Sequence, residues 1–331
     1  MRVYLHKILD KIMLNRRILR IKAFKVLYSS ILAGEESLAH AETVLETSCE
    51  ATRDLYVYML GIVSPLTRIA RERMEAAMGK FNPTEEEKNP NTKFVDNALA
   101  VLLDKDVDFQ KIFSKKKFDW MQYDLFLKRV LSSVMEKEYY QEYMARPERS
   151  LAEDCELFTK IYEEEFVDSE DLEKILEDKS LYWNDDLAYS LTWCCKTLKS
   201  LAKGENWSLL PLYQSELLKG SDVESDKAFV RKLLQCSFGG YEKYSAMVAE
   251  SVSGWEKERL FSTDVVLIAM GLAEAVNFPT IPTKVTMNEY VEISKFYGTP
   301  KSRSFVNGLL DRLIQKLTEE GQIKKTGKGL L

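Results

Sequence analysis

Glycine and proline are scarce in this 331-residue sequence, which contains 14 and 8 of them, below the usual shares of about 7% and 5%. The shortage disfavours β-sandwiches, barrels and nucleotide-binding folds with glycine-rich loops, and it favours long helices. We therefore predict an all-α protein. The length is roughly twice that of a common domain, so the chain holds either two domains or one domain with a large insertion.

Histidine is also rare, with only His6 and His40, and the five cysteines contain no Cys-x-x-Cys pair. A zinc site or a histidine-driven catalytic triad would need other residues, so we expect no metal and no cofactor. The longest apolar stretches, such as residues 265–270, fall far short of the roughly 18 residues that a membrane span needs. We expect a reduced, cytoplasmic protein.

Charge is unevenly distributed along the chain. Residues 1–25 contain eight cations against one carboxylate, Asp10, whereas residues 151–180 contain twelve carboxylates against three lysines. A local basic patch on an acidic protein is typical of a site that binds an anion. The alternative is that both segments are solvated helix faces.

The segment after Asn15 predicts a helix that stops at Gly34. Three arginines, Arg16, Arg17 and Arg20, project on the side of its apolar stripe, one to two turns earlier. Guanidinium groups there could bind phosphates and stack on bases, or they could be ordinary surface arginines. The stripe consists of Phe24, Leu27, Tyr28 and Ile31.

Three prolines punctuate helical segments in the last third of the chain. The first segment covers residues 253–278 and the second covers residues 282–298. The third begins with Thr299 as N-cap and Pro300 as first helical residue. The last segment carries an apolar stripe: Val306, Leu309, Leu310, Leu313 and Leu317.

Glu289 in the middle segment shares a helix face with Val285, Ile293 and Phe296, so its carboxylate should point toward the core and find donors there. We interpret Asn288 and Glu289 as structural hydrogen-bonding residues. No second carboxylate or nucleophile completes an acid–base pair, so we expect no catalytic residue and no enzyme.

Two runs, PTKVTMNEYVEISKFYG at 282–298 and SFVNGLLD at 304–311, resemble the C-terminal signature of the NusB transcription antitermination family. The arginine-rich segment resembles the first helix of that family, and the resemblance covers about residues 14–34 and 222–318. Long members with an internal insertion occur in Bacteroidetes-type bacteria. The motif positions are Trp255, Glu274, Asn288, Glu289, Asn307 and Asp311.

The resemblance implies a pair of three-helix bundles carrying a large helical insertion. It also implies an RNA-binding adaptor that binds boxA-type single-stranded RNA of ribosomal RNA leaders together with the ribosomal protein NusE and joins the RNA polymerase antitermination complex. Relatives differ in self-association, so a homodimer is possible. The implied RNA-binding residues are Arg16, Arg17, Arg20 and Phe305, and two cations at the start of the last helix, Lys301 and Arg303, would add to them.

The predicted organisation has five parts. Residues 1–12 form an upstream leader, with Met13 as the native start, and residues 13–34 form the first family helix. Residues 35–221 form the insertion, residues 222–318 form the rest of the family domain, and residues 319–331 form a basic flexible tail. The insertion contains many aromatic residues, which we assign to core packing, and its acidity suits a basic protein surface better than RNA.

Two other function classes are alternatives. The first is a helical protein–protein scaffold that keeps the family fold without binding RNA. The second is an enzyme, since some ribosomal RNA cytosine methyltransferases carry a similar domain at the N-terminus. The motif run lies instead in the C-terminal third, and no glycine-rich cofactor loop follows a strand.

Overall fold

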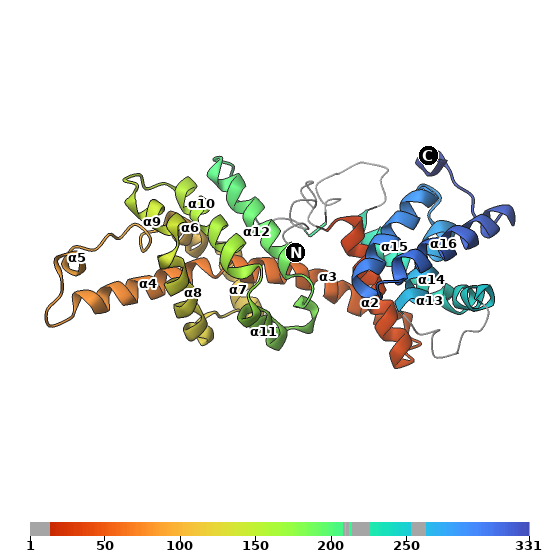
Figure 1. Ribbon diagram of the computed structural model, residues 1–331, viewed down its shortest axis with the longest axis horizontal. Coiled ribbons are helices and arrows are strands. Elements are labelled where there is room, and N and C mark those ends of the chain that lie inside the picture. The colour runs from red at the N-terminus through yellow and green to blue at the C-terminus, as the bar shows by residue number, and fades with distance from the viewer. Residues whose placement is uncertain (1–13, 208, 210–211, 214–224, 253–262, 331) are drawn as a thin grey trace. The chain divides into compact units, whose positions relative to one another are not determined.

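The computed structural model describes residues 14–207, 209, 212–213, 225–252 and 263–330. Every regular element in these ranges is a helix (Figure 1), which confirms the all-α prediction. No helix in this part of the chain combines the length and the apolar character that a membrane span needs. The predicted leader, Met13 and Trp255 lie outside the described residues.

The chain divides into two compact units. Unit 1 contains residues 50–210, and unit 2 contains residues 12–49 and 211–331. The boundary falls within one helix, α3 (Leu38–Leu60), which contributes residues to both units.

Unit 2 is organised around α14, whose residues 265–275 are all buried. This helix packs against each of the other long helices that lie wholly in the unit, including the arginine-rich α2 near the start of the chain. Residues more than two hundred positions apart in the sequence therefore share one core. The helices that lie wholly in unit 2 are α2 (Arg16–Ala33), α13 (Asp226–Ser251), α14 (Thr263–Asn277), α15 (Thr283–Tyr297), α16 (Ser302–Glu319) and the short η6 (Gly327–Leu330).

The predicted ends of the first helix are confirmed. The Asn15 side chain accepts a hydrogen bond from the backbone N–H of Ile18 at 2.9 Å, so it caps α2. Gly34 ends the helix with a φ of 64°, and its N–H donates to the carbonyl of Ile31. A residue with a side chain would be strained there.

Two details of the C-terminal segments differ from the predictions. α16 begins at Ser302 rather than at Pro300, and the Ser302 hydroxyl accepts a hydrogen bond from the N–H of Thr299 at 2.8 Å. The predicted stripe of α16 is buried as expected. On α15, Val285 and Phe296 are exposed by 43% and 53%, which contradicts their predicted place on the core face. The buried face is set instead by Thr286, Tyr290 and Ile293.

The predicted flexible tail packs against unit 2 over residues 320–330. Ile323 is buried, the ammonium group of Lys325 donates to the carbonyl of Phe278 at 2.9 Å, and the N–H of Thr326 donates to the carbonyl of Pro279 at 3.0 Å. These contacts tie the tail to the connection between α14 and α15.

Unit 1 is built on a buried aromatic cluster. The Tyr58 ring stacks on Trp120 with centroids 4.2 Å apart and on Trp183 at 5.3 Å. Both indole N–H groups donate to backbone carbonyls, so the rings are buried without unsatisfied donors. Core packing of these tryptophans is thus confirmed. Beyond α3, the helices are α4 (Val63–Met78), α5 (Glu85–Lys88), α6 (Ala98–Lys105), α7 (Val107–Lys116), η1 (Met121–Tyr123), α8 (Asp124–Glu136), α9 (Glu138–Ala145), α10 (Leu151–Ile161), η2 (Tyr162–Phe166), α11 (Glu170–Lys179), η3 (Leu181–Trp183) and α12 (Leu187–Ala202).

The sequence reads as one helix over residues 54–78, but the structure has a break between α3 and α4 at Gly61. The Phe113 ring lies directly against this glycine, and a Cβ atom placed there would be 1.8 Å from the ring. Only glycine permits this approach. The break thus coincides with this close packing, and the apolar periodicity of residues 54–78 gives no signal of it.

Candidate nucleic-acid interface

Arg20 and Glu274 form a buried ion pair at the centre of unit 2. The Arg20 guanidinium donates from Nε and Nη2 to the two carboxylate oxygens, both at 2.7 Å. The hydroxyls of Thr286 and Tyr290 donate to the same carboxylate at 2.8 and 3.2 Å. Burial alone would lower the pKa of Arg20, but the charge and hydrogen bonds of Glu274 outweigh it and raise that pKa. The carboxylate thus joins α2, α14 and α15.

Arg17, one turn earlier, forms a second two-pronged pair nearer the surface. Its Nε and Nη2 donate to the Glu289 carboxylate at 2.8 and 2.7 Å. The Arg17 side chain is 36% exposed and that of Glu289 is 18% exposed. Glu289 therefore finds donors, as its position in the sequence predicted, and it neutralises part of the charge that Arg17 presents to solvent.

Arg16 contacts α13. Its guanidinium carbon lies 4.8 Å from the centre of the Phe229 ring, and its Nε lies 3.8 Å from a carboxylate oxygen of Asp226. The second distance is too long for a hydrogen bond. The structure thus places Arg16 and Arg17 partly in solvent, while Arg20 is only 2% exposed.

The start of α16 presents a second set of predicted residues. Lys301 and Arg303 are exposed, and Phe305 is half-buried. Between them, the hydroxyl of Ser302 donates to the Asp264 carboxylate at 2.7 Å, which fixes this end of the helix to the start of α14. Lys301 and Phe305 are four residues apart and lie on one side, whereas Arg303 lies on another side of the helix.

Glu292 on α15 pairs with Lys295 of the same helix. The pKa of Glu292 is lowered first by a hydrogen bond from Lys295, and further by the positive charges of Arg17 and Arg303. Lys295 was not predicted as a site residue, although its spacing of three residues from Glu292 on one helix was a usable signal.

The remaining motif positions fall into two groups. Glu274 and Glu289 hold the arginines of α2, as described above. Asn288, Asn307 and Asp311 lie at exposed positions of α15 and α16 and take no part in the core.

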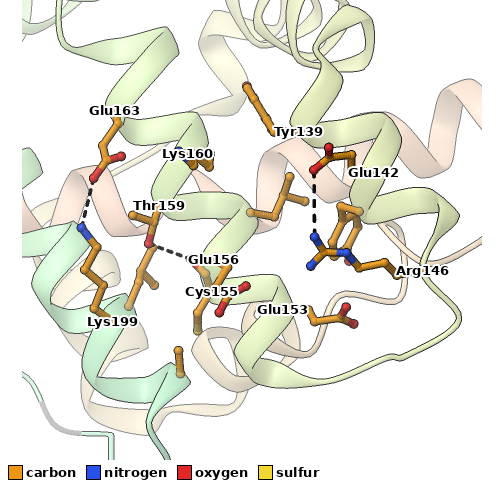
Figure 2. Close-up of a pocket in the computed structure, with 14 residues that line it drawn as sticks. Tyr139, Glu142, Arg146, Glu153, Cys155, Glu156, Thr159, Lys160, Glu163 and Lys199 are labelled. Atoms are coloured by element: carbon orange, nitrogen blue, oxygen red, sulfur yellow. Dashed lines mark hydrogen bonds and ion pairs between the residues drawn. The ribbon is translucent and has the colours of Figure 1, made fainter.

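A cavity of about 350 Å³ lies in unit 1 between α9, α10 and α12 (Figure 2). Three of its four carboxylates lie close to cations: Glu142 to Arg146 at 3.9 Å, Glu153 to Lys93 at 3.1 Å and Glu163 to Lys199 at 3.1 Å. Because these charges balance, the cavity does not attract a polyanion. Burial raises the pKa of the lining Cys155 to about 12, so its thiol stays protonated and is a poor nucleophile.

Comparisons with known proteins point to one family. The NusB family model matches residues 197–315, a range that includes α13, α14, α15 and most of α16. The arginine-rich α2 lies outside this range, and the structure places it against the matched helices.

Three similar proteins each bear the name transcription antitermination protein NusB. The protein of Salinibacter ruber is 33% identical over 107 residues, which are 32% of this chain and 67% of that protein. The protein of Chloroherpeton thalassium is 33% identical over 113 residues, which are 33% of this chain and 54% of that protein. The protein of Alkaliphilus oremlandii is 26% identical over 103 residues, which are 31% and 75% of the two chains. No solved structure matches the chain with significance.

Proposed function

Because this chain belongs to the NusB family, we propose that it is a transcription antitermination factor that works by binding RNA. We propose further that the protein is an adaptor, which binds boxA-type ribosomal RNA leader sequence together with NusE and joins the RNA polymerase complex. The observation that carries it is the start of α16, where Lys301 and Arg303 are exposed and Phe305 is half-buried, together with the exposed Lys295 of α15 and the partly exposed Arg17 of α2.

The chemistry of this region suits single-stranded RNA. Exposed cations bind phosphates without regard to sequence, and a partly exposed ring can stack on an unpaired base. The first turn of the 18-residue helix α16 adds backbone N–H groups and the positive end of the helix dipole. Lys301 and Phe305 on one side and Arg303 on the other would let a strand cross this helix end.

The arginines of α2 are assigned different roles. Arg17 is available for RNA through its exposed part, although a phosphate must compete with the Glu289 carboxylate for it. Arg20 is buried and donates two hydrogen bonds to Glu274. We therefore assign it a positioning role, in which it holds the start of α2 against α14 and α15. Arg16 retains a side chain that is 35% exposed and can reach a phosphate at the edge of the site.

Unit 1 is assigned to protein contacts. Exposed carboxylates lie along α10, η2 and α11. They would repel RNA and attract a basic protein surface. Of these, Asp171 is paired with Arg129 at 2.7 Å. The exposed carboxylates are Glu156, Glu164, Asp168, Glu170, Asp171, Glu173, Glu177 and Asp178.

The test is fluorescence anisotropy with a boxA-type RNA and a scrambled RNA, with and without purified NusE, at several salt concentrations. The full chain should prefer the boxA-type RNA, bind it more tightly with NusE, and lose affinity as salt rises. The double variant Lys301→Ala/Arg303→Ala should reduce the slope of log affinity against log salt by about 1.4, from about 0.7 for each lost phosphate contact on a single strand.

Lys316→Ala is the matched control, because Lys316 is an exposed cation on the same helix, four turns from Lys301. Its salt slope should equal that of the unchanged protein. If the unchanged chain binds neither RNA in any condition, the proposal fails and the scaffold function takes its place. An equal loss in both variants would mean that general charge, and not the start of α16, governs binding.

A further inference from the structure

The C-terminal tail, residues 321–331, contains three lysines and no carboxylate. It lies beyond residue 315, where the match to the NusB family model ends. Within it, the Lys324 side chain is exposed and the Lys325 side chain is half-buried. Among the described residues, neither ammonium group forms an ion pair with a carboxylate. The tail therefore presents positive charge that an anion could neutralise.

Contacts with the connection between α14 and α15 hold this tail in place. The Ile323 side chain is buried. The Lys325 ammonium group donates to the carbonyl of Phe278 at 2.9 Å, which is the anchor of the tail on its charged side. The N–H of Thr326 donates to the carbonyl of Pro279 at 3.0 Å. A cation on a backbone that is already fixed loses less conformational entropy on binding than one on a free tail.

A pair of rings connects the tail to the arginine-rich start of α2. Phe278, which accepts the hydrogen bond from Lys325, packs edge-on against Phe229 of α13 with ring centroids 5.3 Å apart. Arg16 lies over the Phe229 ring at 4.8 Å, and Lys232 of α13 lies over the Phe278 ring at 4.7 Å. Cations from α2, α13 and the tail thus gather around one pair of rings.

Two carboxylates lie near these cations, and both have partners. Asp226 lies 3.8 Å from Arg16, and its side chain is 14% exposed. The charge of Glu274 raises the pKa of Lys325, although burial lowers that pKa more. Both oxygens of Glu274 accept hydrogen bonds from Arg20 inside the core. A local group of cations on a chain with a net charge of -5 is typical of a surface that binds a polyanion.

We propose that α13 and the docked tail form a second RNA-binding surface, on which Lys232, Lys324 and Lys325 bind phosphates of the strand that flanks the boxA-type element. The inference rests on the proposed function, because Arg16 belongs to the edge of that RNA site and also to this group of cations. RNA is the occupant because a strand that reaches Arg16 meets the tail next. Phosphate contacts do not depend on sequence, so the flanking strand needs no particular sequence.

Fluorescence anisotropy with the full chain and three labelled RNAs tests the inference. One RNA is the boxA-type element alone, and the other two carry about six further uridines at the 5′ or the 3′ end. A bound strand leaves the first site in one direction, so one of the two extensions should bind more tightly at low salt. For that RNA, the slope of log affinity against log salt should be steeper by about 1.4, from about 0.7 for each of two added phosphate contacts.

Lys324→Gln/Lys325→Gln should remove this increase in slope and leave the affinity for the boxA-type element alone unchanged. Lys324→Gln by itself retains the hydrogen bond with which Lys325 anchors the tail, and it should remove about half of the increase. Lys105→Gln/Lys115→Gln is the matched control, because both lysines are exposed cations of unit 1. It should leave the increase unchanged.

The outcomes separate this inference from the function on which it rests. If the boxA-type element binds but neither extension changes the slope, the tail surface is overturned and the proposed function stands. If none of the three RNAs binds, both are overturned. Extended RNA that binds the double tail variant as it binds the unchanged chain also overturns the inference. If the double variant loses binding of labelled polyglutamate instead, the surface binds an acidic polypeptide and not RNA.

Discussion

Replacing Arg20 by methionine should strongly destabilise unit 2. The Arg20 side chain is 3% exposed and that of Glu274 is 0% exposed, so the substitution leaves a buried carboxylate without its cation. Thr286 and Tyr290 still donate to it, but removing one partner of a buried pair typically costs about 3–5 kcal/mol. Arg17→Met is the matched control, because its pair is 36% and 18% exposed and should contribute about 1 kcal/mol or less.

Hydrogen exchange followed by mass spectrometry suits this prediction, because it reports on the amides of α14 apart from unit 1. A loss of about 3 kcal/mol should speed the slowest α14 amides by at least about a hundredfold. Adding Glu274→Met removes the stranded charge, so the double variant should be no less stable than Arg20→Met alone. Equal protection of α14 in Arg20→Met and Arg17→Met would refute the reasoning.

Three further results are expected. Gly61→Ala should destabilise unit 1 by about 1–3 kcal/mol in urea unfolding, because its Cβ meets the Phe113 ring, and Phe113→Leu should relieve part of this loss. Burial raises the pKa of Asp154, so the contribution of this residue to stability is greatest below its unfolded pKa of about 3.9 and falls as pH rises through the folded pKa. In Asp154→Asn, the unfolding midpoint should therefore depend less on pH above about pH 4. Phe305→Ala should weaken the binding of boxA-type RNA by about 1–3 kcal/mol in anisotropy titrations, with no change in the slope of log affinity against log salt. A changed slope would contradict a stacking role.

Local signals in the sequence predicted much of unit 2. Asn15 and Gly34 set the ends of α2 because a side-chain cap and a left-handed backbone act over a few residues. The stripe of α16 was predictable because a helix with one apolar face must bury that face. Glu289 was predicted to find donors, and Arg17 supplies them, although the face that it shares with Val285 and Phe296 is not the buried one.

The features that the sequence did not predict are long-range contacts. Val285 and Phe296 fit an apolar stripe, but α14 packs on the neighbouring face of α15 and leaves them exposed. The close contact between Gly61 and the Phe113 ring joins residues more than fifty positions apart. Lys295 joined the candidate site only because α15 packs against both α2 and α16.

The arginines of α2 show most clearly what the sequence determined and what the tertiary structure determined. The sequence by itself determined that a basic first turn precedes an apolar helix, because spacing and charge are local properties. Only the tertiary structure separated the roles of the three side chains, since it placed Glu274 against Arg20, Glu289 against Arg17 and Phe229 against Arg16. Whether a guanidinium binds a carboxylate within the protein or a phosphate outside it depends on which partner the fold brings within reach.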